Sequence, residues 1–271
     1  MIKVAFQGER GAFSEDAVIA FLGDAELFPC RSLGDVFESV MQDRTDFGVV
    51  PVENSQAGSI NDTYDLLLHY SLNIVGEINL RISHCLMALP GENLDRIKTV
   101  YSHPQAIAQC DEFLNKLGAE VIPSYDTAGS AMKIKVQGLK GCAAIASRRA
   151  AQIYGLEILV EEIETSISNY TKFFAISKQK AEATPKSKTS LVFATKNIPG
   201  ALYDSLGAFA TRSINLIKLE SRPSRNKPWQ YIFYADFEGH IADKACQEAM
   251  VELKKKTSFI KVLGSYPRAE Q

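Results

Sequence analysis

The chain has 271 residues, more than one typical domain needs, and suits two domains or one domain with two lobes. Hydrophobic residues make up 46% and charged residues 23%, as in ordinary globular proteins, which argues against a disordered or fibrous protein. The formal net charge of -2, from 30 basic and 32 acidic residues, gives no electrostatic basis for binding nucleic acid or an anionic membrane. We therefore expect small-molecule partners, no nucleic acid and no membrane.

The cysteines and histidines form no recognisable disulfide or metal pattern. The 5 cysteines are scattered without a CxxC pair, and the 4 histidines include neither HExxH nor a helical i,i+4 pair. We expect reduced thiols and no metal. The start, MIKVAFQGERGAF, has no long apolar segment, and no window reaches the roughly 18 to 20 apolar residues of a membrane span. We expect a cytoplasmic protein.

Strands and helices alternate along the first two thirds of the sequence. Apolar runs predict strands, and polar caps followed by apolar periodicity predict helices. The first strands are expected at 2–7 and 47–54, and the first helices at 14–22, 32–43 and 59–70. The alternation continues through 98–155, which indicates a mainly parallel α/β sheet system.

The composition changes at 178–188, where apolar residues nearly vanish, and this stretch is predicted to be a linker. A compact βαββαβ order follows, which is typical of a ferredoxin-like unit. Its strands are expected at 190–195, 214–223, 229–239 and 259–267, and its helices at 200–212 and 243–256.

The loop GERGAFSED carries Gly11 and Ser14 between a strand and a helix N-terminus, where free backbone N–H groups favour an anion. Its spacing fits neither GxGxxG nor a phosphate-binding GxxxxGK[ST] loop, so a nucleotide site is not supported. Both a carboxylate site and a plain turn with a helix cap remain open.

A second loop, VVPVENSQAGSIND, follows a buried-looking strand directly. Ligands of open α/β sheets usually bind at the carboxyl ends of strands. Glu53 could therefore serve as an acid, while Asn54, Ser55 and the Gly58–Ser59 turn could supply donors. The alternative is that the two serines only cap turns.

Two further strand ends carry polar groups at a helix start. In YSHPQAIAQC, Ser102 and His103 end a strand, and Gln105 and Gln109 fall one turn apart on the same helix face. His103 could equally be a structural, hydrogen-bonded residue. CAAIASRR leads to Ser147 in the same way. Four such strand ends predict a cleft for an anionic ligand.

Together these stretches resemble prephenate dehydratase and its relative arogenate dehydratase. The matching stretches are GERGAFSEDA, PVENSQAGSINDTYDLL, SHPQAIAQC, DTAGSA, AAIASRRAA and NYTKFF, the last being similar to the family's Thr-Arg-Phe signature. In the last third, GALYDSLGAFATRSINLIKLESRP resembles the ACT regulatory domain of these enzymes. The resemblance spans nearly the whole chain.

The resemblance implies an α/β fold: a two-lobed, periplasmic-binding-protein-like catalytic domain plus a βαββαβ ferredoxin-like ACT domain. The catalytic domain is expected at 1–180, the linker at 181–188 and the ACT domain at 189–271. Within the catalytic domain, lobe 1 would comprise about 1–78 and 168–180, and lobe 2 about 79–167.

The implied activity is the decarboxylating dehydration of prephenate to phenylpyruvate in phenylalanine biosynthesis, without metal or organic cofactor. L-Phenylalanine would bind the ACT domain as feedback inhibitor of a homodimer or homotetramer. Arogenate, which carries an amino group in place of a keto group, is an alternative substrate. A non-catalytic amino-acid-binding sensor is the alternative from a different class.

The resemblance gives Thr171 an essential role, and a hydrogen bond from its hydroxyl to the departing oxygen is chemically reasonable. The proton could come from a stronger acid, Glu53 or His103. Lys172, where the family has arginine, is a candidate for holding the retained carboxylate, with Asn169 and Phe173 beside the substrate. Adjacent strand residues point to opposite faces, so Lys172 could instead face solvent.

The ACT-like segments supply the candidate phenylalanine site. A helix that opens on glycine lets the backbone approach a carboxylate, and the polar residues at the following strand could bind the amino acid or pair with one another. The candidate residues are Gly200, Ala201, Leu202, Asn215, Glu220, Ser221 and Arg222.

Overall fold

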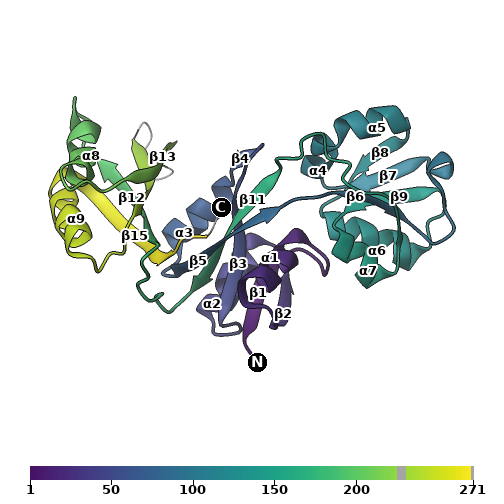
Figure 1. The fold of residues 1–271 in the computed structure, drawn as a ribbon, viewed down its shortest axis with the longest axis horizontal. Helices are drawn as coiled ribbons and strands as arrows, with labels where there is room; N and C mark the ends of the chain where they lie inside the picture. Colours follow the sequence, from purple (N-terminus) through teal and green to yellow (C-terminus); the bar gives the residue numbers. More distant parts are fainter. Residues whose placement is uncertain (225–229, 270–271) are drawn as a thin grey trace. The chain divides into compact units, whose positions relative to one another are not determined.

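The computed structural model describes residues 1–224 and 230–269 (Figure 1). The chain packs into two compact units: residues 1–63 with 78–173, and residues 64–77 with the chain from 174 onward. Of the range predicted as the ACT domain, 225–229 and the last two residues, with the expected strand start at Trp229, lie outside the described residues.

The first sheet has the strand order β2-β1-β3-β11-β5, and β1 runs parallel to both β2 and β3. The short β4 pairs with β3 in the antiparallel sense. The strands are β1 (Lys3–Gln7), β2 (Glu26–Cys30), β3 (Phe47–Asn54), β4 (Gly58–Ser59), β5 (Asn73–Arg81) and β11 (Tyr170–Ser177). The boundary between the two compact units falls inside β5, β11 and helix α3 (Asn61–His69).

Helices α1 (Phe13–Leu22) and α2 (Leu33–Met41) contact β1 and β3. Helix α2 begins where the sequence predicts, because Ser32 and Asp35 form a reciprocal capping box that satisfies two free N–H groups. Both helices thus pack on β1 and β3, the strands that the two predicted polar loops follow.

The second sheet has the strand order β10-β6-β9-β7-β8. Its strands are β6 (Cys85–Ala88), β7 (Thr99–Ser102), β8 (Glu120–Pro123), β9 (Cys142–Ala146) and β10 (Glu157–Val160). β7 is parallel to β8 and β9, whereas β6 is antiparallel to β9 and β10. The expected mainly parallel sheet is thus a mixed sheet here.

Helices cover both faces of the second sheet (Figure 1). Alternate residues of β9 face opposite sides: one set packs with α6 (Thr127–Gln137) and α7 (Arg148–Tyr154), the other with α4 (Pro104–Gln109) and α5 (Asp111–Leu117). A 3-10 turn at Leu94–Arg96 precedes β7. A strand covered on both sides reads as an unbroken apolar run, as CAAIA does.

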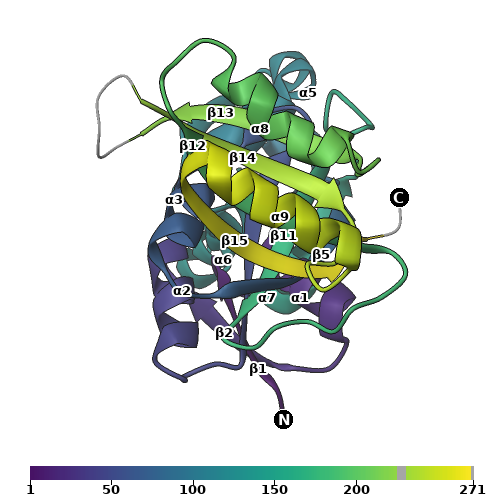
Figure 2. The same cartoon turned by 90° about the vertical axis from the view of Figure 1, so that its left-hand side faces the viewer.

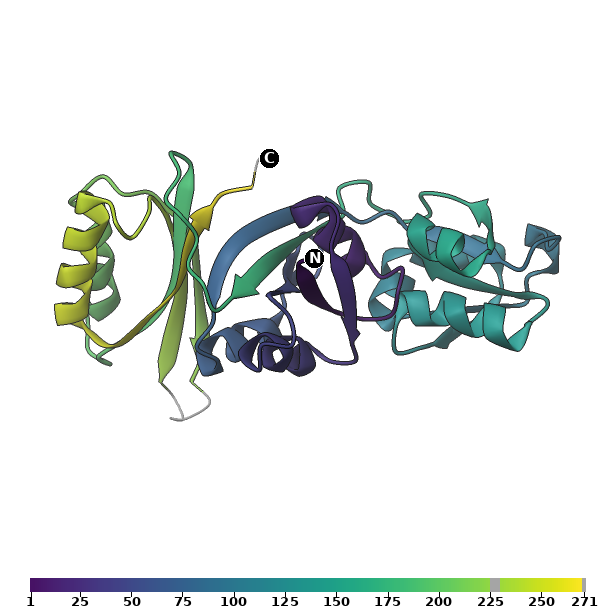
Figure 3. The same cartoon turned by 90° about the horizontal axis from the view of Figure 1, so that it is seen from below.

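The second unit contains a four-stranded sheet of order β13-β14-β12-β15. Its elements are β12 (Ser187–Thr195), α8 (Ala201–Ala210), β13 (Leu216–Pro223), β14 (Tyr231–Glu238), α9 (Lys244–Lys256) and β15 (Thr257–Pro267). This βαββαβ unit confirms the predicted ferredoxin-like fold. Helices α8 and α9 lie side by side on one face of the sheet (Figures 2 and 3), over a core that includes Phe193, Phe209 and Phe237.

The same sheet also makes polar contacts with the 64–77 segment. Lys261 Nζ donates to the carbonyls of Leu67, Leu68 and Tyr70 at 2.9, 2.9 and 2.7 Å, where the C-terminus of α3 leaves carbonyls without helical partners. The Lys188 ammonium lies 2.5 Å from Glu77 and 3.1 Å from Asp236, and all three side chains are buried.

Ser187 and Lys188 correct one sequence-based prediction. Both fall in the stretch interpreted as a linker, yet β12 begins at Ser187 and the two residues are 6% and 2% exposed. Burial of an ammonium group is possible because two carboxylates neutralise it. Within the described residues, no helix is long and apolar enough to cross a membrane.

Candidate active site

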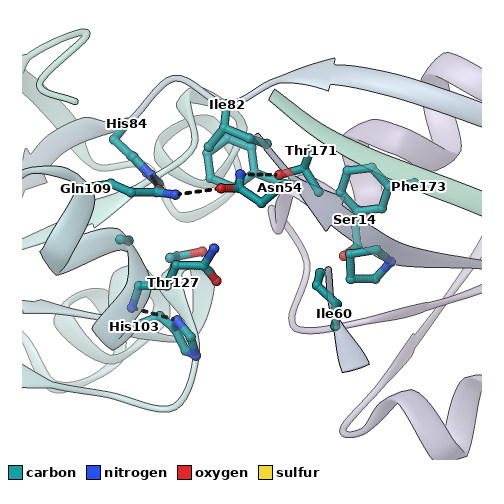
Figure 4. A pocket seen from close by; sticks show the side chains of 14 residues that line it. Ser14, Asn54, Ile60, Ile82, His84, His103, Gln109, Thr127, Thr171 and Phe173 are labelled. Atoms are coloured by element: carbon teal, nitrogen blue, oxygen red, sulfur yellow. Dashed lines mark hydrogen bonds between the residues drawn. The ribbon is translucent and has the colours of Figure 1, made fainter. Parts of the chain in front are cut away.

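A cavity of about 150 Å³ lies in the first unit (Figure 4). Neutral polar side chains and apolar side chains share its wall. The lining residues are Phe13, Ser14, Pro51, Asn54, Ile60, Ile82, His84, His103, Gln105, Ala106, Gln109, Thr127, Thr171 and Phe173. Seven of these were predicted from sequence, namely Ser14, Asn54, His103, Gln105, Gln109, Thr171 and Phe173.

Strand β11 delivers Thr171 and Phe173 to the cavity. The two side chains are separated by one residue, so they share a face of the strand. Lys172 is not among the lining residues, and its ammonium lies 3.7 Å from the Glu53 carboxylate. Lys172 therefore faces away from the cavity, which is the alternative that strand alternation predicts. It pairs with Glu53, and both side chains are about a third exposed.

Asn54, at the end of β3, connects the strand ends. Its Oδ1 accepts from the backbone N–H groups of Gln56 and Ala57 at 3.1 and 3.0 Å. Its Nδ2 then donates to Thr171 Oγ1 at 3.0 Å (Figure 4). The same nitrogen donates to Asn169 Oδ1 at 2.9 Å. Since Oγ1 accepts this bond, the hydroxyl hydrogen of Thr171 is left to donate elsewhere.

Gln109 joins Asn54 to a residue that the sequence analysis missed. Its Nε2 donates to Asn54 Oδ1 at 3.4 Å, and its Oε1 lies 2.8 Å from His84 Nε2. His84 follows β5 in the stretch RISHCLMA. The position of His84 between two predicted apolar segments was the only local sign of a functional role. A structural histidine at that position would look the same in the sequence.

Helix starts surround the cavity. Phe13 and Ser14 begin α1, Thr127 begins α6, and Ile60 precedes the first residue of α3. The first N–H groups of a helix have no partner within it and carry partial positive charge. Among the described residues, those that line the cavity include no carboxylate, ammonium or guanidinium group. At α6 the Asp126 carboxylate caps the helix start, accepting from Gly129 N at 3.0 Å, whereas α1 has no side-chain cap. The start of α1 therefore offers its backbone dipole to an anion in the cavity.

Both histidines of the cavity are held neutral at neutral pH. Burial lowers the pKa of His84 below 6.5, although the Gln109 hydrogen bond and the Glu164 charge oppose it. Burial also lowers the pKa of His103, against the opposing charge of Asp126. The Nδ1 of His103 accepts the N–H of Gln105 at 3.2 Å, which caps α4. Neither ring is a ready proton donor at pH 7.

The remaining predicted substrate-binding residues lie outside the cavity wall. Ser147 caps α7, accepting from Ala150 N and donating to Gly11 O at 2.6 Å. The N–H of Gly11 donates to the buried Glu15 carboxylate. Gly11 has φ +88°, and a Cβ there would lie 2.7 Å from Ala150 Cα, so this glycine permits close contact between the α1 and α7 loops.

Four further residues support the strand ends instead. Ser102 Oγ donates to Ile145 O at 2.7 Å. Ser55 Oγ accepts from Tyr170 N and donates to Ser168 O, which ties the β3 loop to β11. Gly58 and Ser59 form β4 opposite Asn54 and Glu53. The Ser55 bonds and the β4 pairing hold Asn54 and Thr171 in place, whereas the Ser102 bond joins β7 to β9.

The candidate phenylalanine-binding residues lie in the second unit. Gly200 caps α8 with φ 80°, and Ala201 and Leu202 open that helix. Lys218 pairs with Glu220 at 3.2 Å, and Arg222 with Asp65 at 3.4 Å, so both candidate side chains form ion pairs within this unit. Ser221 is exposed on β13, an edge of the sheet, and Asn215 is exposed just before it.

No group of three or more histidine, cysteine, aspartate or glutamate side chains in residues 1–224 and 230–269 could hold a metal ion. The cysteines in these ranges are free, and burial raises the pKa of Cys110 to about 12. An unreactive thiol fits a packing role.

Comparisons with known proteins agree with the motifs. A family model described as prephenate dehydratase matches residues 4–181. Arogenate dehydratase/prephenate dehydratase 2 of Arabidopsis thaliana, a chloroplastic protein, is 42% identical over 98% of this chain and 73% of its own length.

Two solved structures are also similar. The prephenate dehydratase of Arthrobacter aurescens in complex with L-Phe is 32% identical, with a TM-score of 0.89 over 99% of this chain and 90% of that one. GqqA, described as a novel type of quorum quenching acylase, is 34% identical, with a TM-score of 0.90 over 98% of both chains. The chain belongs to the prephenate dehydratase family.

Proposed function

We propose that the protein catalyses the decarboxylating dehydration of prephenate to phenylpyruvate, with arogenate as the alternative substrate, and that it works in the cytoplasm. One observation carries the proposal. The Thr171 hydroxyl accepts a hydrogen bond from Asn54 at 3.0 Å and lines a cavity, so its own hydrogen can be donated to a ligand there. Family membership supports the reaction class.

In the proposed step, the bond between the ring and its carboxylate breaks and CO₂ leaves. The electron pair enters the ring, the ring becomes aromatic, and the bond to the ring hydroxyl breaks. Hydroxide departs to bulk solvent, where a buffer acid protonates it or the released CO₂ captures it as bicarbonate. The Thr171 O–H donates to this oxygen as negative charge builds on it, which stabilises the transition state more than the ground state.

The uncharged wall suits loss of a carboxylate. A firm contact to the carboxylate that becomes neutral CO₂ would stabilise the ground state and slow the reaction. Phe13, Ile82 and Phe173 offer that group an apolar surface. The N–H groups at the start of α1, which has no side-chain cap, would hold the retained carboxylate on the side chain.

The site does not support the acyl transfer that the description of GqqA names. Acyl transfer by an enzyme hydroxyl needs an adjacent base to remove its proton. The partner of Thr171 here is the amide nitrogen of Asn54, which donates a hydrogen and cannot accept one.

We further propose L-phenylalanine as allosteric effector of a homodimer or homotetramer. Support comes from the L-Phe complex of the Arthrobacter relative and from the βαββαβ unit. The exposed edge strand β13, with Leu219 44% exposed, suits pairing with a second copy. Analytical ultracentrifugation with and without L-phenylalanine measures this assembly.

Thr171 is tested by substitution to valine and to serine. We expect Thr171→Val to lower kcat by roughly 100-fold or more, with a small change in KM, because it removes the donor to the departing oxygen. Thr171→Ser keeps the hydroxyl and should retain much of the activity. Steady-state assays with prephenate measure both, and equal kcat values for the valine variant and the native protein would contradict the role.

Substrate preference is measured by giving the native protein prephenate and arogenate separately. Phenylpyruvate or phenylalanine formation identifies the substrate, and adding L-phenylalanine to the same assay tests feedback. Turnover of neither substrate, together with tight L-phenylalanine binding, would favour the non-catalytic sensor.

A further inference from the structure

The hydrogen bonds at the inner end of the cavity run in one direction. Asn54 Oδ1 accepts from two backbone N–H groups, of Gln56 and Ala57, which can only donate. The Asn54 amide is thereby oriented, and its nitrogen faces Thr171 Oγ1. Reversing the amide would set its oxygen against the Tyr170 carbonyl, which Nδ2 now contacts at 3.2 Å, and its nitrogen against two donors.

The same reasoning orients Gln109. The atom 3.4 Å from Asn54 Oδ1 must be the amide nitrogen, since an oxygen there would repel Oδ1. Gln109 Oε1 then lies 2.8 Å from His84 Nε2, so this ring nitrogen carries the proton. The order of donation is His84 to Gln109, Gln109 to Asn54, and Asn54 to Thr171.

His84 is held in place by packing and by backbone hydrogen bonds. The side chain is buried, with the residue 2% exposed, and the ring packs edge-on against Phe13 at 5.4 Å and 84°. The backbone is fixed on both sides: its N–H donates to Glu164 Oε2 at 2.9 Å, and its carbonyl accepts from Ile163 N at 3.1 Å. Neither contact uses the ring, whose Nε2 is therefore available to Gln109.

We propose that His84 is a positioning residue of the dehydratase site, whose Nε2–H orients Gln109 and, through Asn54, makes Thr171 present its hydroxyl hydrogen to the leaving oxygen. This inference rests on the proposed function of the cavity. Aligned hydrogen bonds polarise one another, so the relay also makes the Thr171 O–H a better donor.

The kinetic test replaces the ring donor while keeping the space filled. In His84→Phe the ring remains but the donor is lost, and we expect kcat to fall roughly 10- to 100-fold with KM nearly unchanged, as for misplacement of a reacting group. In His84→Gln the terminal nitrogen stands three bonds from Cβ, as His84 Nε2 does, so kcat should be largely restored.

His69→Phe is the matched control, because His69 is exposed at the end of α3 and should leave kcat unchanged. A double variant, His84→Phe with Gln109→Met, should lose no more activity than the worse single variant, because both changes interrupt one relay. Multiplying losses, or equal kcat values for the Phe and Gln variants, would overturn the proposal.

A measurement on the native protein is independent of activity and of variant folding. With ¹⁵N-labelled histidine, the ring shifts of His84 should report the neutral tautomer protonated at Nε2 at pH 7.5. A ring protonated at Nδ1 alone would overturn the proposal whatever the kinetics show. If the native protein turned over neither prephenate nor arogenate while His84 showed the expected tautomer, the proposed function would fail and the relay geometry would stand.

Discussion

Thr171 and Lys172 are neighbours on one strand, yet they meet different surroundings. Side chains alternate between the two faces of a strand, so a cavity reached by Thr171 and Phe173 is not reached by the residue between them. Lys172 contacts the Glu53 carboxylate at 3.7 Å instead. The position at which the family signature has arginine is thereby separated from the cavity wall.

This arrangement predicts that Lys172 contributes little to turnover. Lys172→Met should change kcat and KM by less than about threefold, since Lys172 does not line the cavity and its partly exposed ion pair with Glu53 contributes at most about 1 kcal/mol to stability. Lys172→Arg, which restores the family residue, should behave the same way. Steady-state kinetics with prephenate measure both variants. A tenfold or larger rise in KM for Lys172→Met alone would show instead that the ammonium holds the retained carboxylate.

Sequence reasoning succeeds at single residues where periodicity decides the side that a side chain faces. Gln105 and Gln109, one helical turn apart, both line the cavity as their spacing predicts. His84 could not be predicted because its partner is 25 residues away and its own neighbours show no pattern. The apolar wall of Phe13, Ile60 and Ile82 was missed because an apolar residue beside a cavity looks like any core residue.

Helices α1 and α7 meet through two adjacent carboxylates that ionise differently. Glu15 is fully buried, and although burial alone would raise its pKa, hydrogen bonds from Gly11, Arg149 and Arg10 hold the pKa below its usual value. Asp16 lies 3.7 Å from Arg149, and burial raises the pKa of its carboxyl to about 6. Burial disfavours the charged form of both carboxylates; the hydrogen bonds to Glu15 outweigh it, whereas the Arg149 charge near Asp16 does not.

Asp16→Asn should therefore stabilise the protein above pH 6. Between about pH 4 and 6 the folded protein binds more protons at Asp16 than the unfolded chain does, so the free energy of unfolding falls as pH rises through this window. Asparagine avoids that loss, and we expect a gain of about 1–2 kcal/mol at pH 7.5 that disappears by about pH 4.

Urea denaturation at pH 7.5, 5.5 and 4 measures this change. Asp35→Asn is the wrong-site control, because that carboxylate is exposed in the capping box of α2 and its loss should cost stability at pH 7.5. A less stable Asp16→Asn variant at pH 7.5 would mean that the Arg149 charge outweighs burial. The Arg149–Glu15 contact beside it joins residues 134 apart in sequence, beyond any local pattern.

At the scale of the whole molecule, a cluster of buried charges brings together residues far apart in the sequence at the start of β12. Lys188 lies within 3.1 Å of Asp236 and 2.5 Å of Glu77, and Ser190 bridges Asp236 and Tyr266 at 2.5 and 2.6 Å. The order of elements in this unit could be predicted from apolar runs. The start of its first strand could not be predicted, because a polar sequence looks solvent-exposed even where its charges are buried and paired with residues distant in the chain.

Lys188→Met should destabilise the protein by about 3–5 kcal/mol, since it leaves two buried carboxylates without a counter-ion. Lys256→Met is the matched control: Lys256 pairs with Glu252 on the surface of α9 and should cost less than about 1 kcal/mol. Differential scanning calorimetry measures both. Equal melting temperatures for the two variants would show that the Lys188 cluster adds no net stability.

The uncharged cavity wall has a consequence for inhibitors. Its lining residues carry no charged side chain, so an anion there would bind the backbone N–H groups at the start of α1, and no substitution deletes a backbone N–H except one to proline. An anionic inhibitor held there would depend on no single side chain for its charge. Resistance through one point mutation would then require a change in the helix start itself, which the substrate would also lose.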